Sequence, residues 1–523
     1  MTVEKKESNI RWGVTAACAA VVFTLGILAA VIPEKVKVAF STVFDIFGFK
    51  LGWTYSLFTL IMTVVVIAVA FSKYGQIYLG GDTPAFSKFK LFAMSFAAGM
   101  GGSTMYWAFI ESIYYYMDPQ FGIVDSAMAK EYATAFNLFH WGPMGWALYL
   151  SIGIPFLIVF YVKKSRDMSF SGLFSSLYEG KIGSWKRNLL DFLFILVTLF
   201  ATALTLGLII PMISSTLSNF LGVPDTLMSG ILIILALAIL FTLSSYIGIE
   251  KGMARISNAT MYIALALMVI VLIVGPTFFI LNNITNSMGI VLKEYLRMSL
   301  NTAPYGSSGF PQWWTIFFIA NWFSYAPGIG VFITKISKGH RLKDVILILM
   351  GGGSIGCFTF LGICGSYTMK LMDTGAIDAV GMINAGNPAG VIDGVFRASG
   401  IPSIMFILYL LGMILFTVTT LDGTSYSLTA AASRKVSANG DVNPVFRLFW
   451  CLLLTVIPIT YLLIGADIAL LKTFPVAIVF PLIPLACLAM KKTMDVLKNT
   501  YGKLPGDRIG EITAGDACDP MKG

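Results

Sequence analysis

Three aromatic residues follow one another at helical intervals in the apolar stretch FHWGPMGWALY, residues 139–149. Trp141, Trp146 and Tyr149 stand at i, i+5 and i+8, which places their rings roughly along one side of a helix. Rings of this kind either line a binding site or anchor a helix at a membrane interface. Both interpretations stay open for Trp146 at this point.

A second aromatic stretch, Gln312–Arg341, reads QWWTIFFIANWFSYAPGIGVFITKISKGHR. Its first half is aromatic and apolar at helical spacing, Pro and Gly interrupt it at 326–330, and its end is basic. We predict a membrane helix that loses backbone hydrogen bonds near mid-depth. Because non-helical backbone at that depth survives only beside a cavity or buried in protein, we expect a binding site beside Trp322 and Tyr325.

Rings gathered from these stretches could bind a quaternary ammonium group. Such a group donates no hydrogen bond, so it is recognised by aromatic faces, each contributing about 0.5 to 2 kcal/mol when desolvated. Several rings suffice without a buried carboxylate, which would be costly at mid-membrane. The predicted box consists of Tyr114, Trp141, Trp146, Tyr149, Trp322 and Tyr325.

The composition indicates an all-α integral membrane protein. Among 523 residues, 57% are hydrophobic and only 12% are charged, with a mean hydropathy of +0.81, too little polar surface for a soluble globule of this size. Apolar runs long enough to cross roughly 30 Å of hydrocarbon recur about twelve times. We place them near residues 11–32, 52–72, 89–115, 133–162, 188–211, 225–247, 257–281, 311–336, 344–370, 401–431, 446–465 and 470–490.

Charge predicts the orientation of these spans in a cell membrane. With the first residue inside, roughly three quarters of the 36 Lys and Arg residues fall on the cytoplasmic side, so both termini are expected there. No cleavable signal peptide is expected before the first span. The net charge of +9 follows from this bias, and we expect a lipid bilayer and no nucleic acid as partner.

The third predicted span carries a run of small residues at 97–104, with Glu111 further along. Glycines this dense weaken a helix, so we expect it to unwind near Met100, although a close helix-packing motif gives the same pattern. Interrupted helices at corresponding positions of two halves are typical of inverted-repeat transporters, whose sites lie between the broken helices. The eighth span supplies the second expected interruption.

The domain organisation follows from this pairing. We expect a cytoplasmic tail, two peripheral helices, a first repeat, an amphipathic extracytoplasmic helix, a second repeat and a cytoplasmic tail. These cover residues 1–10, 11–88, 89–281, 282–310, 311–490 and 491–523.

We find no motif for catalysis in the sequence. The two histidines are far apart, no cysteine pair has metal-ligand spacing, and no phosphate-binding glycine motif is found. We therefore expect neither an enzyme nor a bound cofactor.

Motifs across nearly the whole chain resemble those of the betaine/carnitine/choline transporter (BCCT) family. The similar elements are FHWGPMGWALY, parts of IESIYYYMDPQFG at 110–122, the SKGHR end at 337–341, and Trp314, Thr315, Ile316, Phe318 and Trp322 in register. The resemblance implies a LeuT-like five-plus-five inverted-repeat fold preceded by two helices, usually a homotrimer. It also implies import of trimethylammonium compounds.

The resemblance also implies site residues. Trp141, Trp146, Tyr149 and Trp322 match the central site of sodium-coupled betaine symporters, and Tyr114 matches a position of the carnitine exchanger. Two departures are Ile319 and Asn321, where the family pattern has tryptophans. An amide at Asn321 could instead bond a substrate carboxylate or hydroxyl.

By the same resemblance, one sodium ion is expected between the third and tenth spans. Its ligands would be the carbonyls of Ala97, Met100 and Phe416 and the hydroxyls of Thr419 and Thr420. Sodium-independent exchangers of the family replace the ions with Arg and Met, but Thr260 and Ile329 stand there in this chain. We therefore favour symport, with sodium as the coupling ion. Sodium-independent carnitine/γ-butyrobetaine exchange is the alternative.

The charge of the substrate is predicted from the glycine run around Ser103. Choline-transporting relatives tend to have an Asp in this run, and residues 99–104 contain no acid. A zwitterion of the glycine betaine or carnitine type is therefore favoured over choline. Glu111 and Asp422 are interpreted as structural hydrogen-bond partners between helices.

Overall fold

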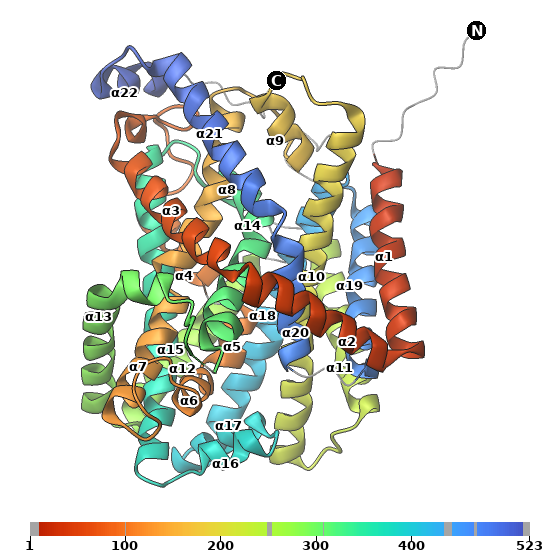
Figure 1. Ribbon diagram of the computed structural model, residues 1–523, viewed down its shortest axis with the longest axis vertical. Helices are drawn as coiled ribbons and strands as arrows, with labels where there is room; N and C mark the ends of the chain where they lie inside the picture. The colour runs from red at the N-terminus through yellow and green to blue at the C-terminus, as the bar shows by residue number, and fades with distance from the viewer. Residues whose placement is uncertain are drawn as a thin grey trace.

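The computed structural model describes residues 10–99, 101–247, 254–306, 308–433, 442–464 and 468–515. In these residues the chain is a bundle of helices (Figure 1). The only β pairing among them is two isolated bridges.

The first half of the bundle begins with α1, which stands at one side, and α2, which crosses the front (Figure 1). The elements are α1 Trp12–Val31, α2 Pro33–Phe44, η1 Asp45–Lys50, α3 Gly52–Phe71, η2 Lys73–Gln76, α4 Lys88–Gly99, α5 Gly102–Trp107, α6 Glu111–Met117, α7 Ala127–His140, α8 Pro143–Tyr161, α9 Phe170–Leu177, α10 Ser184–Leu221, α11 Leu227–Ile247 and α12 Ala254–Val274.

The second half begins with α13, which is bent by 113° away from α12. The elements are α13 Thr277–Leu300, η4 Pro311–Ile316, α14 Phe317–Ile336, α15 Leu342–Asp373, α16 Ala379–Asn384, α17 Pro388–Ala398, α18 Pro402–Ala431, α19 Pro444–Ile464, α20 Ile468–Val479, α21 Leu482–Tyr501 and α22 Gly506–Ala514. Helix α13 covers most of the segment predicted to be an amphipathic helix.

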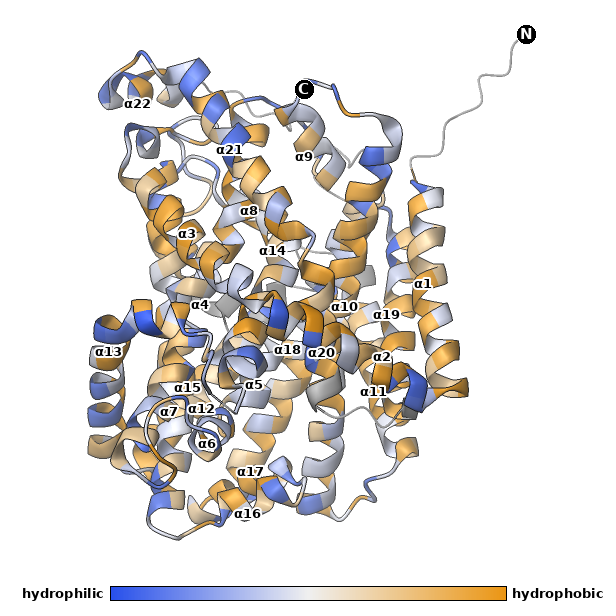
Figure 2. Ribbon diagram, viewed as in Figure 1, coloured by the Kyte–Doolittle hydropathy of each residue, from blue (hydrophilic) through white to orange (hydrophobic). Residues whose placement is uncertain are grey.

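Apolar helices of spanning length dominate the described residues. Eight are each long and apolar enough to cross a membrane, and the number reaches ten if each of two bent pairs forms one span. Figure 2 shows hydrophobic residues along α1, α3, α10 and α15 and hydrophilic residues gathered in α22 and α13. The chain is therefore a multi-pass membrane protein. Within the described residues each predicted span lies on helix, but the third, fourth and twelfth are divided between successive helices. The seventh, predicted to reach residue 281, ends with α12 at Val274, where the chain bends by 113° into α13. The twelve-span, five-plus-five arrangement stays a prediction.

The third predicted span is interrupted where its glycines indicated. Helix α4 ends at Gly99, Gly101 has extended backbone (φ −99°, ψ −177°), and α5 begins at Gly102. A methyl group at Gly102 would lie 2.5 Å from Ile209 Cδ1 of α10, so this glycine also permits close packing. The predicted break is confirmed, and Met100 itself lies outside the described residues.

The break predicted at residues 326–330 is wrong, because α14 runs through it as unbroken helix with Pro327 inside. Proline removes one intrahelical hydrogen bond, but such a loss is tolerated where neighbouring helices enclose the segment. The glycines here serve helix packing. A methyl group at Gly330 would lie 3.4 Å from the Cα of Gly153 and 2.9 Å from the ring of Phe156, so the two backbones approach closely. The irregular turn lies earlier, in the π-helix η4.

Candidate substrate-binding site

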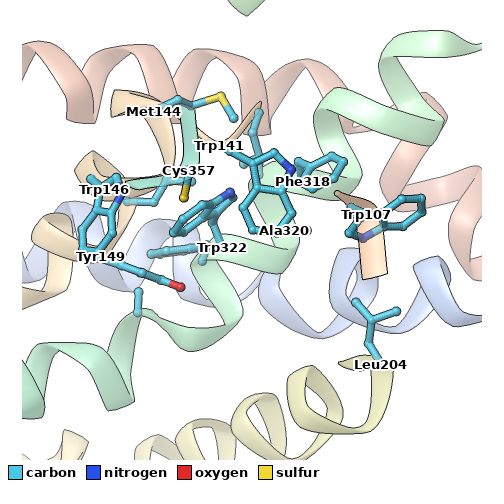
Figure 3. Close-up of a cluster of buried hydrophobic side chains, with 14 of the residues drawn as sticks. Trp107, Trp141, Met144, Trp146, Tyr149, Leu204, Phe318, Ala320, Trp322 and Cys357 are labelled. Carbon is cyan, nitrogen blue, oxygen red and sulfur yellow. The ribbon is translucent and has the colours of Figure 1, made fainter. Parts of the chain in front are cut away.

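Four aromatic rings from α8, α14 and the α7–α8 junction pack together in the core, with Trp322 at their centre (Figure 3). The Trp322 ring centroid lies 5.6 Å from that of Trp141, 6.0 Å from Trp146 and 4.9 Å from Tyr149. Trp146 and Tyr149 also meet edge to face at 5.6 Å. All four side chains are buried. The structure thus brings together four of the six predicted rings, and we call them the aromatic box.

Glycines make room for two of these rings. A methyl group at Gly145 would lie 2.4 Å from the indole of Trp322, and one at Gly353 would lie 1.8 Å from the indole of Trp146. Real Cβ atoms do not approach ring carbons so closely, so α8 and α15 must carry glycine at these points.

Hydrogen bonds fix two of the indoles. Trp322 Nε1 donates to the backbone carbonyl of His140 at 2.9 Å, and Trp141 Nε1 donates to Glu111 Oε2 at 2.8 Å. Glu111 is fully buried and also pairs with the hydroxyl of Tyr115. The carboxylate therefore holds the ring of Trp141 in place. This agrees with its interpretation as a structural partner between helices.

His140 continues this network. Its Nδ1 lies 2.8 Å from the Tyr115 hydroxyl, its Nε2 lies 3.0 Å from Thr315 Oγ1, and its ring stacks on Phe318 at 4.9 Å. Both ring nitrogens are used. The imidazole is a hydrogen-bonded part of the scaffold that positions Glu111 and, through its carbonyl, Trp322.

Two buried side-chain atoms of predicted site residues have no hydrogen-bond partner among the described residues: Trp146 Nε1 and Asn321 Oδ1. The first is a donor and the second an acceptor. A buried polar group without a partner costs about 1 to 3 kcal/mol, so such groups call for an explanation. A ligand that accepts a hydrogen bond at one end and donates one elsewhere would satisfy both.

The other predicted ligand-binding side chains lie beside the box. Tyr114 contacts Trp107 and Trp314, at ring-centroid distances of 6.0 and 5.6 Å. No aromatic contact of Tyr114 or Tyr325 with the four rings is found within the described residues.

Tyr325 faces α10, where its hydroxyl donates to the carbonyl of Ala201 and meets Thr205 Oγ1, each at 2.8 Å. Ser103 joins this chain of hydroxyls, since its Oγ lies 3.0 Å from Thr205 Oγ1. These hydroxyls connect the start of α5 to α14 through α10.

One expected ion ligand of α18, Thr420, lies near the interruption between α4 and α5. A methyl group at Gly101 would lie 3.9 Å from Thr420 Oγ1. The hydroxyls of Thr419 and Thr420 each lie 2.9 Å from the carbonyl of Phe416, to which they donate. Ala97 lies within α4, one turn before the break, and Met100 lies outside the described residues. Oxygen atoms suited to an alkali cation are therefore present on one side of the interruption.

Sequence reasoning missed one charged residue near the box, Lys472 of α20. Its Nζ lies 3.2 Å from the ring centroid of Trp314. The side chain is buried, with 4% exposed. Its position inside the apolar run ALLKTFPV was the available signal, because a charge within a span is a functional candidate by default.

Comparisons with known proteins agree with the class that this architecture defines, a multi-pass membrane protein with a buried aromatic site. A family model described as "BCCT, betaine/carnitine/choline family transporter" matches residues 13–502. The chain belongs to this transporter family, and transport, not enzyme catalysis, is the activity of the class.

Two relatives are similar over most of their length. A protein of Acinetobacter baumannii named carnitine transporter is 32% identical over 465 residues, covering 87% of this chain and 84% of the relative. An Escherichia coli (strain K12) protein named uncharacterized transporter YeaV is 33% identical over 449 residues, covering 85% and 93%.

The fit of Trp146 against Gly353 yields a test. Gly353→Ala forces the indole to move, so we expect loss of high-affinity substrate binding and a destabilisation of about 1 to 3 kcal/mol. Thermal stability and ligand binding of the purified protein measure both. Gly351→Ala is the matched control on the same helix, because nothing lies within 4 Å of its added methyl group. Equal behaviour of the two variants would contradict the packing described.

Proposed function

We propose that this chain is a secondary active transporter that imports a zwitterionic quaternary-ammonium compound of the carnitine or glycine betaine type, coupled to sodium. The observation that supports this most is the aromatic box, in which Trp322 meets three other rings with centroids at 4.9 to 6.0 Å. Its rings offer a trimethylammonium group the faces that it binds.

Entry of a substrate requires the box to open. Rings at these separations contact one another directly, so a trimethylammonium group reaches their faces only when α8 and α14 shift relative to each other. This motion is the local form of alternating access, in which one repeat moves against the other around a central site. We expect movement to be easiest at the interruption between α4 and α5, because α14 is unbroken.

The rest of the substrate is matched by the two unpartnered atoms. Trp146 Nε1 supplies a hydrogen bond to a carboxylate, and Asn321 Oδ1 accepts one from a hydroxyl. Carnitine carries both groups and glycine betaine only the carboxylate. This favours the carnitine type, in line with the printed name of one relative at 32% identity.

Sodium coupling is supported by the hydroxyls and carbonyl of α18 beside the α4–α5 break. The membrane potential adds about 2.3 kcal/mol of driving force per sodium charge per 100 mV. The proposal includes location in the cell membrane with both termini cytoplasmic, the LeuT-like inverted repeat, and assembly as a homotrimer, all by family resemblance.

Replacement of Trp322 tests the box. Trp322→Leu removes the central ring, so saturable uptake of radiolabelled carnitine and glycine betaine into proteoliposomes should fall roughly ten- to thirtyfold in kcat/KM, the loss of one desolvated cation–π contact of about 1.4 to 2 kcal/mol. Trp450→Leu is the control, since Trp450 of α19 is equally buried but lies among Phe446 and Phe449. Both variants should lose stability. If Trp322→Leu transports like Trp450→Leu, the box is not the substrate site.

Replacement of the α18 hydroxyls tests the coupling ion. Thr419→Ala with Thr420→Ala should raise the sodium concentration for half-maximal uptake roughly five- to tenfold, equivalent to about 1 to 1.4 kcal/mol. Thr285→Ala is the control, because this exposed hydroxyl also bonds back to its own helix, at Leu281 O. Initial rates in wild-type vesicles that stay undiminished when potassium replaces sodium would reject symport and favour exchange.

A further inference from the structure

The buried ammonium of Lys472 lies in a cage of three rings contributed by other helices. Its Nζ lies 3.2 Å from the ring centroid of Trp314, 5.1 Å from Phe317 and 5.9 Å from Trp107, and it donates to the carbonyl of Trp313 at 3.1 Å. Within the described part of the chain, no carboxylate lies within 4 Å of it. Aromatic faces and one carbonyl therefore replace a direct counter-ion.

The carboxyl group of Glu111 is connected to these rings through Tyr115. The ring of Tyr115 meets that of Trp314 edge to face at 4.9 Å, and its hydroxyl pairs with Glu111. The rings of Tyr115 and Trp314 thus connect the two groups, and within the described residues Lys472 and Glu111 do not form a contact ion pair.

The hydrogen-bond network around Glu111 can be assigned with this carboxylate ionised. Trp141 Nε1 can only donate, and it donates to Oε2. The Tyr115 hydroxyl then donates to Oε1, His140 Nδ1–H donates to the Tyr115 oxygen, and the Thr315 hydroxyl donates to His140 Nε2. This assignment leaves the imidazole neutral, one carboxylate charge on Glu111 and one ammonium charge on Lys472.

Both charges act on whatever occupies the aromatic box. Glu111 bonds directly to the indole of Trp141. Lys472 is connected to the same indole by a series of ring contacts. Its Nζ lies over the ring of Trp107, the ring centroids of Trp107 and Phe318 are 6.2 Å apart, and those of Phe318 and Trp141 are 5.5 Å apart. In this buried surrounding of low polarity, neither field is screened as it would be in water.

We propose that Glu111 and Lys472 are a compensating charge pair that keeps the net charge around the aromatic box at zero and thereby selects ligands that themselves carry no net charge. This inference rests on the proposed function of the box. A buried charge is costly, and each of these two would bias the box if it were alone. Together they leave the rings to hold the methylated nitrogen while a zwitterion is preferred over a monocation.

Substitutions of the two residues should change ligand preference in opposite directions. In Lys472→Met, the uncompensated carboxylate should favour the monocation tetramethylammonium over glycine betaine. In Glu111→Gln, the uncompensated ammonium should favour glycine betaine further. Each ratio of dissociation constants should shift about five- to tenfold, because one unit charge in a buried site is then left without compensation.

The experiment measures competition of tetramethylammonium and glycine betaine against radiolabelled glycine betaine on the purified full chain. Because both ligands share the trimethylammonium group, loss of a ring contact changes both affinities and leaves their ratio unchanged. The double variant should return to within about twofold of the wild-type ratio. Lys472→Arg should keep that ratio, since it keeps the charge.

The outcomes separate this inference from the proposed function. If wild type binds neither of these two ligands nor carnitine, the proposed function fails. If wild type binds both, but the two single variants leave the ratio unchanged or shift it in the same direction, the charge pair is rejected and the box stands. Thermal stability of each variant identifies a loss of folding, and Glu111→Gln tests the inference independently if Lys472→Met does not fold.

Discussion

The packing of the Trp322 indole against three other rings is the contact on which the rest of the site depends. Edge-to-face aromatic pairs contribute about 0.5 to 1.5 kcal/mol beyond their buried area. Here such pairs join α8 to α14, and the indole N–H is fixed at the carbonyl of His140. Gly145 and Gly353 exist at their positions because the two tryptophans leave no space for a side chain. The backbone approach of α8 and α14, the network around His140 and the orientation of Trp141 all follow from keeping these rings in place.

The buried polar groups around the aromatic box are few, and their contacts fix their geometry. Glu111, His140 and Tyr115 satisfy one another, and Lys472 is held by rings. No water is available in the hydrocarbon core of a membrane, so each buried polar group needs a partner within the protein. The buried side-chain atoms without a hydrogen-bond partner in the described residues include Trp146 Nε1 and Asn321 Oδ1, which the proposed function assigns to the substrate.

Much of the fold could be predicted from the sequence, because apolar runs of spanning length and a glycine cluster have direct physical consequences. The helices lie where the apolar runs predicted them, and the break between Gly99 and Gly102 is where the glycines are densest. Pro327 misled the prediction, since its effect depends on whether neighbouring helices enclose the turn, and that information is not local. Trp141, Trp146, Tyr149 and Trp322 were found from spacing and family resemblance.

The remaining ring positions depend on which way each helix faces. Tyr325 lies one turn from Trp322, yet its hydroxyl is directed to α10. Tyr114 belongs to the cluster around Trp314. The place of Lys472 depends on the packing of α20 against η4 and α5, residues far apart in the sequence. A single charged residue in an apolar run predicts that the side chain has a partner, but the sequence does not identify that partner.

The most direct test of a substrate site built from aromatic faces is an experimental structure with bound carnitine. We expect the quaternary nitrogen within about 6 Å of the ring centroids of Trp322 and at least two other box residues, with the carboxylate toward Trp146 Nε1. A carnitine molecule whose nitrogen is held by a carboxylate away from these rings would contradict this site.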